Sequence, residues 1–544
     1  MIKRIAGLIF FFTSLLVIFA QEQLLSDTET YYDFLSLQGI AERPYLNYRT
    51  LSDSEWTISE DAEHPWQEQN LGTFRNLFAG FRMRIYGPDV LFSYNTAVPY
   101  GQNDSVLWQG KGFNAYLTGG VRFEGYGLEL TLKPEFSFSQ NQAFELVPFY
   151  MDGQYADANY AGKAGEYGYF GLRHIDAPQR FGDSPFFSYS WGDSEIRYTW
   201  KTLTIGFGTQ NIWLGPAKVN PLLHSNNAAP YPKLDIGLRK QPVTIFGWYA
   251  GDVEFRTFWG KLTESDYFDN DSSNDGNLVT GVTFSYAPSF LSGLVLGVHR
   301  TMLSKWSDLD YRGIFTLLWP FMETSAGTDE RDQRASITLS YIFPSVGFEV
   351  YAEWGRNDYS PNLDMIIRYP FHTQAYTLGA AKSIRLNEKH NISGLLTLEI
   401  TNLESSRDYS LTGVETTFYA HHIIKQGYTN RGQWLGPGIG TGGNSQLLSF
   451  DVYYPRGKSS LLLQRRNPDN DYVWYYRKNT DSTREYRFRT DLSIGINTLF
   501  HILKNQSCFF EFVFTDIHNY KYEASLRSVH TYNCSISAGY RLVF

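Results

Sequence analysis

The chain has 544 residues, of which 17% are aromatic, including 39 Tyr and 40 Phe, and its formal net charge is -9. The negative charge argues against nucleic acid as a partner, and beyond the first twenty residues no apolar run is long enough for a transmembrane helix. A high aromatic content with few cysteines is instead typical of a transmembrane β-barrel, which carries aromatic residues at both membrane interfaces.

Residues 1–20 are predicted to be a signal peptide. Lys3 and Arg4 provide a basic start, residues 5–19 form an apolar core, and Ala20 is a small residue suited to cleavage. The alternative is a membrane anchor, but the apolar stretch is short and a polar segment follows it at once. We therefore expect the protein to be exported.

Residues 21–75 are expected to form a short periplasmic segment of helical and irregular structure. Ser26 and Glu29 have the spacing of a capping box, and Gly39 stands where a helix would end, so we predict a helix over 27–38. The segment is too small for an independent domain, and we expect it to pack against the periplasmic mouth of a barrel.

Residues 76–544 alternate repeatedly between apolar and polar side chains, as in 128–133 and 348–354. A period of two predicts strands with one apolar and one polar face. About eighteen strands are predicted, near 78–86, 113–122, 126–138, 194–200, 202–209, 243–249, 252–261, 278–287, 292–299, 333–342, 346–354, 375–384, 391–401, 446–454, 458–465, 485–498, 506–515 and 531–544.

Short and long connections alternate between these strands. Short turns are predicted at Gly125, 249–251, 343–345 and 455–457, and the long excursions are 139–193, 210–242, 300–332 and 402–445. This alternation and the even strand number are typical of outer-membrane proteins. The last strand ends in the aromatic Phe544, which resembles the signal read by the barrel-assembly machinery. We predict an all-β, antiparallel barrel that contacts lipid in the outer membrane of a diderm bacterium.

Charged residues of both signs share the parity that faces the barrel interior. They can line a pore, but mixed signs without a ring of one sign favour paired charges in a plugged interior. These residues are Glu129, Lys133, Glu135, Glu195, Arg197, Glu254, Arg256, Glu349, Glu353, Arg487, Arg489, Asp491, Glu511 and Arg541.

Cys508 and Cys534 are placed symmetrically about position 521, taken as the centre of the last hairpin, and share the outward parity. They can face each other on adjacent strands and form a disulfide in an oxidising compartment. The alternative is two free thiols that act as small apolar residues, and the sequence leaves both possibilities open.

Several motifs that can carry chemistry are incomplete. The acidic run 266–275 lacks the pattern of a calcium loop, and the adjacent His421 and His422 point apart on a strand without a third ligand. The glycine-rich stretch 436–443 lacks the ending of a phosphate-binding loop. We expect no metal, no cofactor and no enzymatic activity, with a glycosidase pair of loop carboxylates as the remaining catalytic alternative.

The loops 210–242 and 402–445 combine aromatic rings with amide and guanidinium donors, held by Gly and Pro turns. Rings stack on the apolar faces of sugars, and amides and guanidinium groups pair with hydroxyls. The alternative is that the same residues fold inward and plug the barrel, with Asn side chains capping turns. The candidate polysaccharide ligands are Trp213, Asn226, Asn227, His422, Tyr428, Arg431 and Trp434.

These loops resemble the Wzi family of capsule-assembly proteins. The residues from Trp213 to Pro216, followed by 225–228 and Pro232, are similar to its Trp-Gly-Pro and Ser-Asn-Asn-Ala signature, although Leu214 interrupts the first motif. The segment 421–436 is similar to a late extracellular segment of the family. The resemblance runs from about Tyr31 to Phe544.

The resemblance implies an eighteen-stranded barrel with a closed lumen, a periplasmic helical part and a lectin-like role. The region before residue 75 departs from the family pattern, since it holds one clear helix. We expect a non-enzymatic protein that binds capsular polysaccharide or exopolysaccharide and anchors it at the cell surface. A diffusion porin and a glycan-modifying enzyme are the alternatives.

Overall fold

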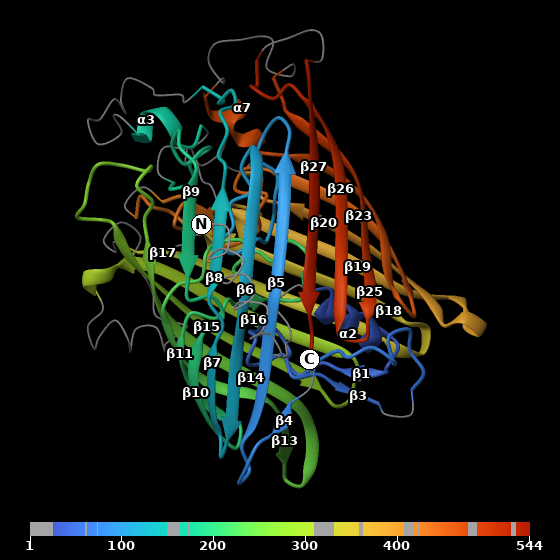
Figure 1. Ribbon diagram of the computed structural model, residues 1–544. Coiled ribbons are helices and arrows are strands. Elements are labelled where there is room, and N and C mark those ends of the chain that lie inside the picture. Colours follow the sequence, from blue (N-terminus) through green and yellow to red (C-terminus); the bar gives the residue numbers. More distant parts are fainter. Residues whose placement is uncertain are drawn as a thin grey trace.

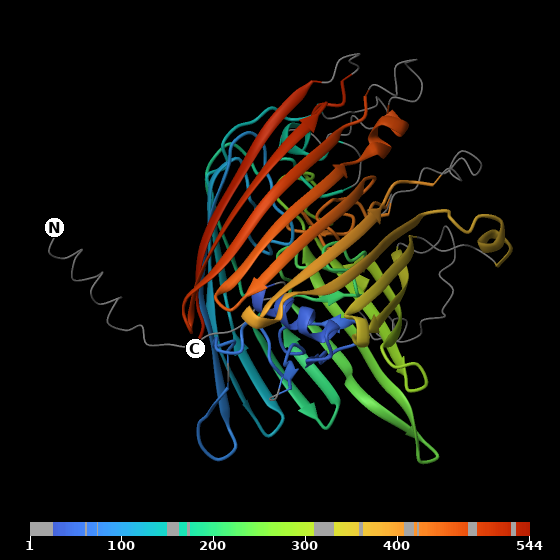
Figure 2. The same cartoon turned by 90° about the vertical axis from the view of Figure 1, so that its right-hand side faces the viewer.

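The computed structural model describes residues 26–59, 62–72, 74–148, 163–170, 175–308, 331–357, 363–406, 418–421, 424–476, 487–523 and 529–544. Over these residues the chain forms a closed antiparallel barrel of 18 strands, as the alternation predicted (Figures 1 and 2). Closure comes from β27 (His530–Leu542), which pairs with β5 (Arg82–Asn95). The described sheet therefore has no open edge along these strands.

Two of the eighteen positions hold a pair of short strands each. β7 (Leu128–Leu132) and β8 (Glu135–Ser139) are separated at Pro134, which has no backbone N–H for the ladder. The other pair is β9 (Phe186–Ser190) and β10 (Glu195–Trp200). The remaining strands are β6 (Gly112–Gly125), β11 (Leu203–Gly208), β13 (Lys233–Ile245), β14 (Trp248–Thr263), β15 (Gly276–Pro288), β16 (Leu294–Lys305), β17 (Asp332–Phe343), β18 (Phe348–Asn357), β19 (Gln374–Asn387), β20 (Ile392–Asn402), β23 (Asn444–Tyr454), β24 (Gly457–Asn467), β25 (Thr490–Leu503) and β26 (Gln506–His518).

The predicted alternation of connections is confirmed. Tight turns such as 246–247 and 455–456 lie at one end of the barrel, and long connections such as 209–232 and 403–443 lie at the other. In outer-membrane barrels the short turns face the periplasm and the long loops face outward. We use this rule to name the two mouths.

Some predicted boundaries are wrong around Pro242. The residues 249–251, predicted as a turn, lie inside β14, and the turn is at 246–247. β13 begins at Lys233, so the loop predicted over 210–242 ends at 232. Pro242 suggests a loop, but it sits in β13 between two register irregularities, where a missing N–H is tolerated. The excursion predicted over 139–193 likewise contains β9.

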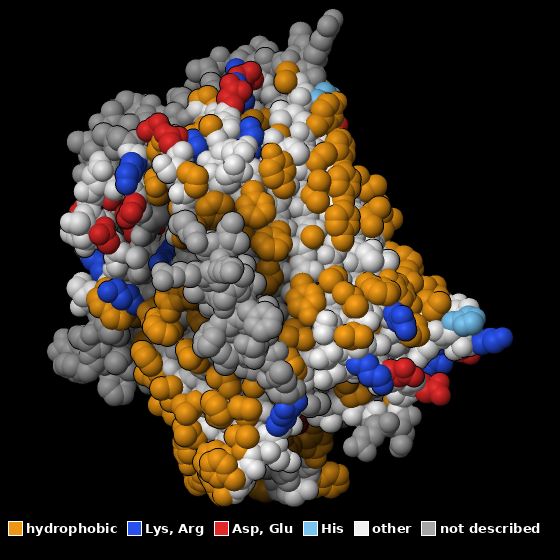
Figure 3. Space-filling view, viewed as in Figure 1, with side chains coloured by type: hydrophobic (Ala, Val, Ile, Leu, Met, Phe, Trp, Pro, Cys, Tyr) orange, Lys and Arg blue, Asp and Glu red, His pale blue; other side chains and the backbone are white. Residues whose placement is uncertain are grey.

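The outer face of the barrel is apolar. Along β10 and β11 the outward residues alternate with buried polar ones, and Ile196, Trp200 and Phe207 are each 60% exposed. Figure 3 shows hydrophobic side chains over much of the strand surface. Exposed apolar surface of this extent fits contact with lipid.

The N-terminal segment packs against the inner face of the barrel. The predicted helix corresponds to α2 (Asp27–Leu37), whose N-cap Ser26 accepts a hydrogen bond from the Glu29 N–H. Its buried aromatic residues pack against Trp66 and Tyr453. The short strands β1 (Ala41–Glu42), β2 (Tyr48–Arg49), β3 (Thr57–Ile58) and β4 (Arg75–Asn76) follow. None of the helices described is long and apolar enough to cross a membrane.

Three inward-facing glutamate side chains, Glu254, Glu353 and Glu399, accept hydrogen bonds from backbone N–H groups of internal segments. Glu254 accepts three N–H groups from 46–48 at 2.8 to 2.9 Å. Glu399 accepts three from 218–220 at 2.7 to 3.2 Å, and Glu353 accepts one from the same loop at 2.9 Å. Hydrogen bonds to ionised groups are stronger than neutral ones, so these carboxylates fix the internal segments in place.

Many of the inward-facing charges form ion pairs, as their mixed signs predicted, whereas Glu254 and Glu353 accept backbone N–H groups instead. The Arg197 guanidinium lies 2.8 Å from Glu195 and 2.5 Å from Asp235, and all three side chains are buried. Arg256 lies 2.8 Å from Asp53 of the N-terminal segment. Opposite charges therefore neutralise one another locally within the barrel.

Of the two possibilities for the cysteines, the structure has the free thiols. Cys508 pairs with Tyr540, and Cys534 pairs with Phe514, so the two residues are not opposite each other. The register pairs Gln506 with Leu542, which places the centre of the hairpin near 524 instead of 521. The disulfide is therefore excluded by register.

Candidate functional site

The two long loops singled out in the sequence, bounded as 209–232 and 403–443, are joined at the outer mouth. The side chain and backbone N–H of Ser225 donate to two successive carbonyls of the second loop at 2.7 and 2.8 Å. The Asn227 amide donates to the Trp434 carbonyl at 3.1 Å. The two loops thus form one packed unit.

Tyr428 lies in the core of this unit. It is 0% exposed, its hydroxyl lies 2.9 Å from Nδ1 of His224, and its ring stacks on Tyr419 at 5.7 Å. The Arg334 guanidinium lies 4.5 Å from the centre of the same ring. Burial lowers the pKa of His224 to about 3, so its imidazole is neutral at ordinary pH. Tyr428 therefore packs the loops and does not face outward.

Trp213, Asn226 and Asn227 are also buried. Trp213 belongs to β12 (Trp213–Leu214), is 1% exposed, and donates its indole N–H to the Ala217 carbonyl at 2.9 Å. The Asn227 side-chain oxygen accepts the Asn103 N–H at 3.2 Å. These residues hold the loops in shape, which is the role that the sequence left open beside ligand binding. His422 lies outside the described residues.

Trp434 is half-buried and packs mainly inside the loop unit. Its ring lies edge-on to Tyr169 at 5.6 Å and tilted against Tyr419 at 6.0 Å. It flanks the hydrophobic core instead of lining the outer pocket described next.

Arg431 is presented by a tight turn. β21 (Thr429–Asn430) and β22 (Gln433–Trp434) pair, and the two residues between them, Arg431 and Gly432, have φ of 51° and 78°. Two positive φ angles in a two-residue hairpin loop are typical of a type I′ turn. The Asn430 amide anchors the hairpin by donating to the Ala229 carbonyl at 2.8 Å. Arg431 is left exposed at the tip.

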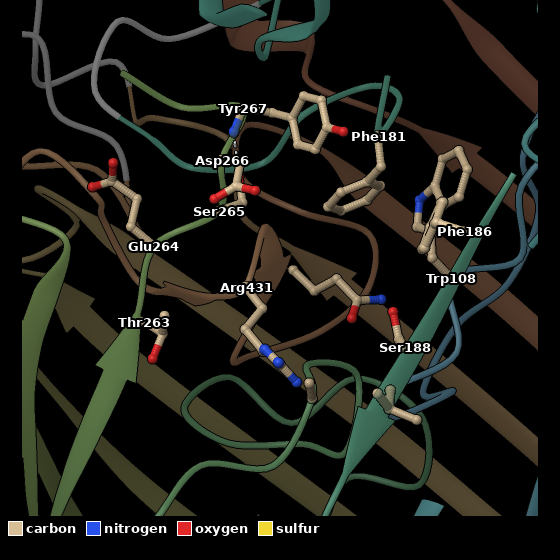
Figure 4. A pocket seen from close by; sticks show the side chains of 13 residues that line it. Trp108, Phe181, Phe186, Ser188, Thr263, Glu264, Ser265, Asp266, Tyr267 and Arg431 are labelled. Atoms are coloured by element: carbon tan, nitrogen blue, oxygen red, sulfur yellow. Dashed lines mark hydrogen bonds between the residues drawn. The ribbon is translucent and has the colours of Figure 1, made fainter. Parts of the chain in front are cut away.

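The tip of this hairpin lines a pocket of about 340 Å³ at the outer mouth (Figure 4). Five parts of the chain that are distant in sequence build it: 106–108, 181–188, Ala229, 263–267 and 431–433. The lining residues are Val106, Trp108, Phe181, Phe186, Ser188, Ala229, Thr263, Glu264, Ser265, Asp266, Tyr267, Arg431 and Gln433.

The pocket has an aromatic side and a polar side (Figure 4). Phe181 packs edge-on against Trp108 at 5.2 Å and against Tyr267 at 5.8 Å, which makes a continuous aromatic wall. Glu264 lies across from this wall, and the Arg431 side chain lies between Thr263 and Ser188. Aromatic faces next to carboxyl, guanidinium and amide groups have the chemistry to bind sugars.

Burial sets the charge of the acidic groups beneath the pocket. Asp176 accepts the N–H groups of Ser265 and Gly432 at 2.7 and 3.1 Å, and burial raises its pKa to about 6 against these hydrogen bonds. Burial and the neighbouring carboxylate of Asp269 raise the pKa of Glu264 to about 10. At neutral pH Glu264 is therefore protonated and shares its proton with the Asp269 carboxylate in a hydrogen bond.

The acidic run beyond Glu264 is used locally. Asp266 lines the pocket, while Asp269 and Asp271 each accept a backbone N–H two residues on, at 2.8 and 3.0 Å. This is the turn-forming use of Asp.

Of the six candidate ligands that the structure describes, Arg431 alone is among the residues that line the pocket, and the sequence missed Trp108, Phe186, Tyr267 and Glu264. Gln433 lies within the segment 421–436 but was not among the candidate ligands. The only local signal for Trp108, Phe186 and Tyr267 is an aromatic residue outside the predicted strands. Their convergence depends on contacts between segments far apart in the chain.

Comparison with known proteins agrees with the fold and the resemblance. The solved structure of Wzi from Escherichia coli, described as an outer membrane protein involved in group 1 capsule assembly and a carbohydrate-binding β-barrel, matches with a TM-score of 0.55 at 14% identity. The match covers 86% of this chain and 85% of that one. No match was found among curated proteins.

More distant similarity extends to OccAB4 of Acinetobacter baumannii, with 6% identity, a TM-score of 0.39, and coverage of 87% of this chain and 99% of that one. At this level the likeness carries no argument. The family model for the capsule assembly protein Wzi matches residues 111–496, which is more than half of the chain. The chain therefore belongs to the Wzi family of capsule assembly proteins.

Proposed function

We propose that this protein is an outer-membrane lectin that binds exported capsular polysaccharide or exopolysaccharide and holds it at the cell surface. Membership of the Wzi family supports this proposal, as does the carbohydrate binding described for the Escherichia coli relative. The observation that carries it is the aromatic pocket at the outer mouth, with Arg431 on its rim.

The pocket of 181–188, 263–267 and 431–433, and not the buried part of the two loops, is the proposed contact surface. Its volume of about 340 Å³ is at the small end of ligand sites. One such site binds a short stretch of polymer weakly. A repeating polysaccharide gains affinity when many barrels on one cell hold the same chain.

We further propose that the internal segments close the lumen, so that the protein is not a diffusion porin. The support is the set of hydrogen bonds that the backbone N–H groups of 46–48 and 218–220 donate to Glu254 and Glu399. Moving either segment aside would break these hydrogen bonds and leave the N–H groups without their carboxylate partners. The binding role proposed here includes no catalytic step.

The surroundings of the barrel belong to the same proposal. Outer-membrane lipid would contact the exposed apolar strand faces, and the barrel-assembly machinery would insert the chain after export. The signal peptide over 1–20 lies outside the described residues and remains a prediction.

Binding of the purified, detergent-solubilised barrel to the immobilised polysaccharide of the same strain tests the proposal. Arg431→Ala removes an exposed group at the pocket, and Arg385→Ala removes another exposed arginine, near the periplasmic turns. We expect Arg431→Ala to weaken binding about tenfold, the effect of losing an important arginine contact, while Arg385→Ala binds as the wild type. Equal binding by both variants would contradict the proposed pocket.

A further inference from the structure

A cluster of two histidines and one aspartate lies on the outward face of the last hairpin, away from the polysaccharide pocket. His518 of β26 and His530 of β27 are directly paired across the strands. Asp516 lies two residues before His518 and so shares its face. Their ligand atoms all lie within 4.8 Å of one another.

The Asp516 carboxylate contacts both histidines at distances close to those between two ligands of one small ion. The Asp516 carboxylate lies 2.8 Å from Nδ1 of His530 and 3.2 Å from Nε2 of His518. Four ligands around a tetrahedral Zn²⁺ with bonds of about 2.0–2.1 Å have neighbouring donor atoms about 3.3 Å apart. The three side chains therefore need only small adjustments to share one ion.

The orientation of His518 adds a second observation. Its Nε2 atom is shielded from solvent and makes no hydrogen bond to any described residue, although it faces the carboxylate of Asp516. The contact of this nitrogen with Asp516 at 3.2 Å is an ion pair only when the histidine is protonated. A metal ion between the nitrogen and the carboxylate would satisfy both groups.

The position on the barrel suits a cation. Tyr532, which lies opposite Asp516 and is 58% exposed, stacks at 5.9 Å on Phe514, the next outward residue of β26 toward the periplasm. An aromatic pair of this kind marks the membrane interface. The two histidines lie beyond this pair toward the outer ends of the strands, and Asp516 lies level with Tyr532, so the cluster is at the outer edge of the aromatic surface.

We propose that Asp516, His518 and His530 form a binding site for a divalent transition-metal ion, with Zn²⁺ as the expected metal. Two imidazoles and one carboxylate are a donor set that zinc prefers over calcium or magnesium. Three protein ligands leave the fourth position for water or an external oxygen ligand. Because the ligands come from both strands, the ion would cross-link β26 and β27 near their outer ends.

Titration of Zn²⁺ into the folded barrel, in competition with a chromophoric chelator, tests the site. The protein must carry no oligohistidine tag, because a tag would bind the metal itself. The test variants are His518→Gln and His530→Gln, and the control is His390→Gln, an exposed histidine near the periplasmic turns. Heat-modifiable migration in gels verifies that each variant is folded.

We expect one Zn²⁺ per chain, with affinity about tenfold or more weaker in each test variant, since even outer-shell changes cost 10- to 100-fold. His390→Gln should bind as the wild type. Co²⁺ in place of Zn²⁺ should give the visible absorption of a four-coordinate site, which the test variants lose. Absence of binding by the wild type, or equal affinity in the wild type and His518→Gln, overturns the proposal.

Discussion

The hydroxyl of Tyr428 lies 2.9 Å from Nδ1 of His224, and this contact ties the two long loops together beneath the outer mouth. The other ring nitrogen of His224 lies 2.6 Å from the Tyr231 hydroxyl. Because the imidazole is neutral, one nitrogen donates and the other accepts. The three side chains thus form a complete buried hydrogen-bond chain.

Tyr428→Phe should loosen this loop unit without unfolding the barrel. The substitution keeps the ring but leaves His224 Nδ1 buried without a partner, which costs about 1–3 kcal/mol. We expect faster proteolysis within 403–443 and a lower midpoint of guanidinium unfolding, both measured in detergent. Tyr189→Phe, at an outward-facing residue that is 41% exposed, is the control. Equal proteolysis rates for the two variants would argue against a structural role for Tyr428.

Glu264 should make the outer loops sensitive to alkaline pH. Its pKa is raised to about 10, because of burial and then of the Asp269 carboxylate, from an ordinary value of 4.5. The folded state therefore holds this proton more tightly than the unfolded state does. The resulting stability is fully present below about pH 4.5 and is lost progressively as the pH rises toward about 10.

Glu264→Gln removes the ionisable group, so its melting temperature should exceed that of the wild type at about pH 9 and match it at about pH 4.5. Thermal unfolding in detergent at both pH values measures this difference. Glu388→Gln, which removes an exposed carboxyl group near the periplasmic turns, is the control. A Glu264→Gln difference that is the same at both pH values would show that the carboxyl does not titrate as described.

Cys508 and Cys534 should both be free in protein purified without reductant. Cys508 is opposite Tyr540, so the register places the two cysteines six residues apart along the strands. This spacing corresponds to a distance on the order of 20 Å. Thiol titration of the denatured, unreduced protein should give two reactive groups per chain. A value near zero, with two thiols appearing after reduction, would mean that the register of the last hairpin is wrong.

The barrel should not conduct ions in a planar bilayer. Glu254, Glu353 and Glu399 hold the internal segments through backbone N–H groups, and replacing all three with Ala removes these anchors. We expect no steady conductance from the wild type and fluctuating channel events from the triple variant. A stable open conductance of the wild type would favour the porin alternative.

The fold was largely predictable from the sequence because each strand carries its own signal. Alternation places side chains on two faces, and the long and short connections order the strands. The errors occurred where a single residue misled the pattern, as at Pro242, or where the register depends on the length of a loop. The error at the last hairpin, whose centre lies near 524 and not at 521, is of the second kind. This error decides whether Cys508 and Cys534 can form a disulfide.

The candidate site was predicted only at the level of the loops. Tyr428 and Arg431 belong to the same stretch of loop, but one is completely buried and the other is exposed. An aromatic residue in a loop looks the same in the sequence whether it packs against other loops or binds a ligand. Trp108 and Tyr267 meet near Phe181 only because three distant connections converge at the mouth. This convergence cannot be predicted from the local sequence.

The central claim, that the outer pocket holds exported polysaccharide at the surface, is tested most directly by the division of polymer between cells and medium. The gene would be deleted and complemented with the wild type, Arg431→Ala or Arg385→Ala, and attached and released polysaccharide would be measured. We predict that deletion and Arg431→Ala shift polymer from the attached to the released fraction with total synthesis unchanged. An unchanged division in the deletion strain would contradict the account.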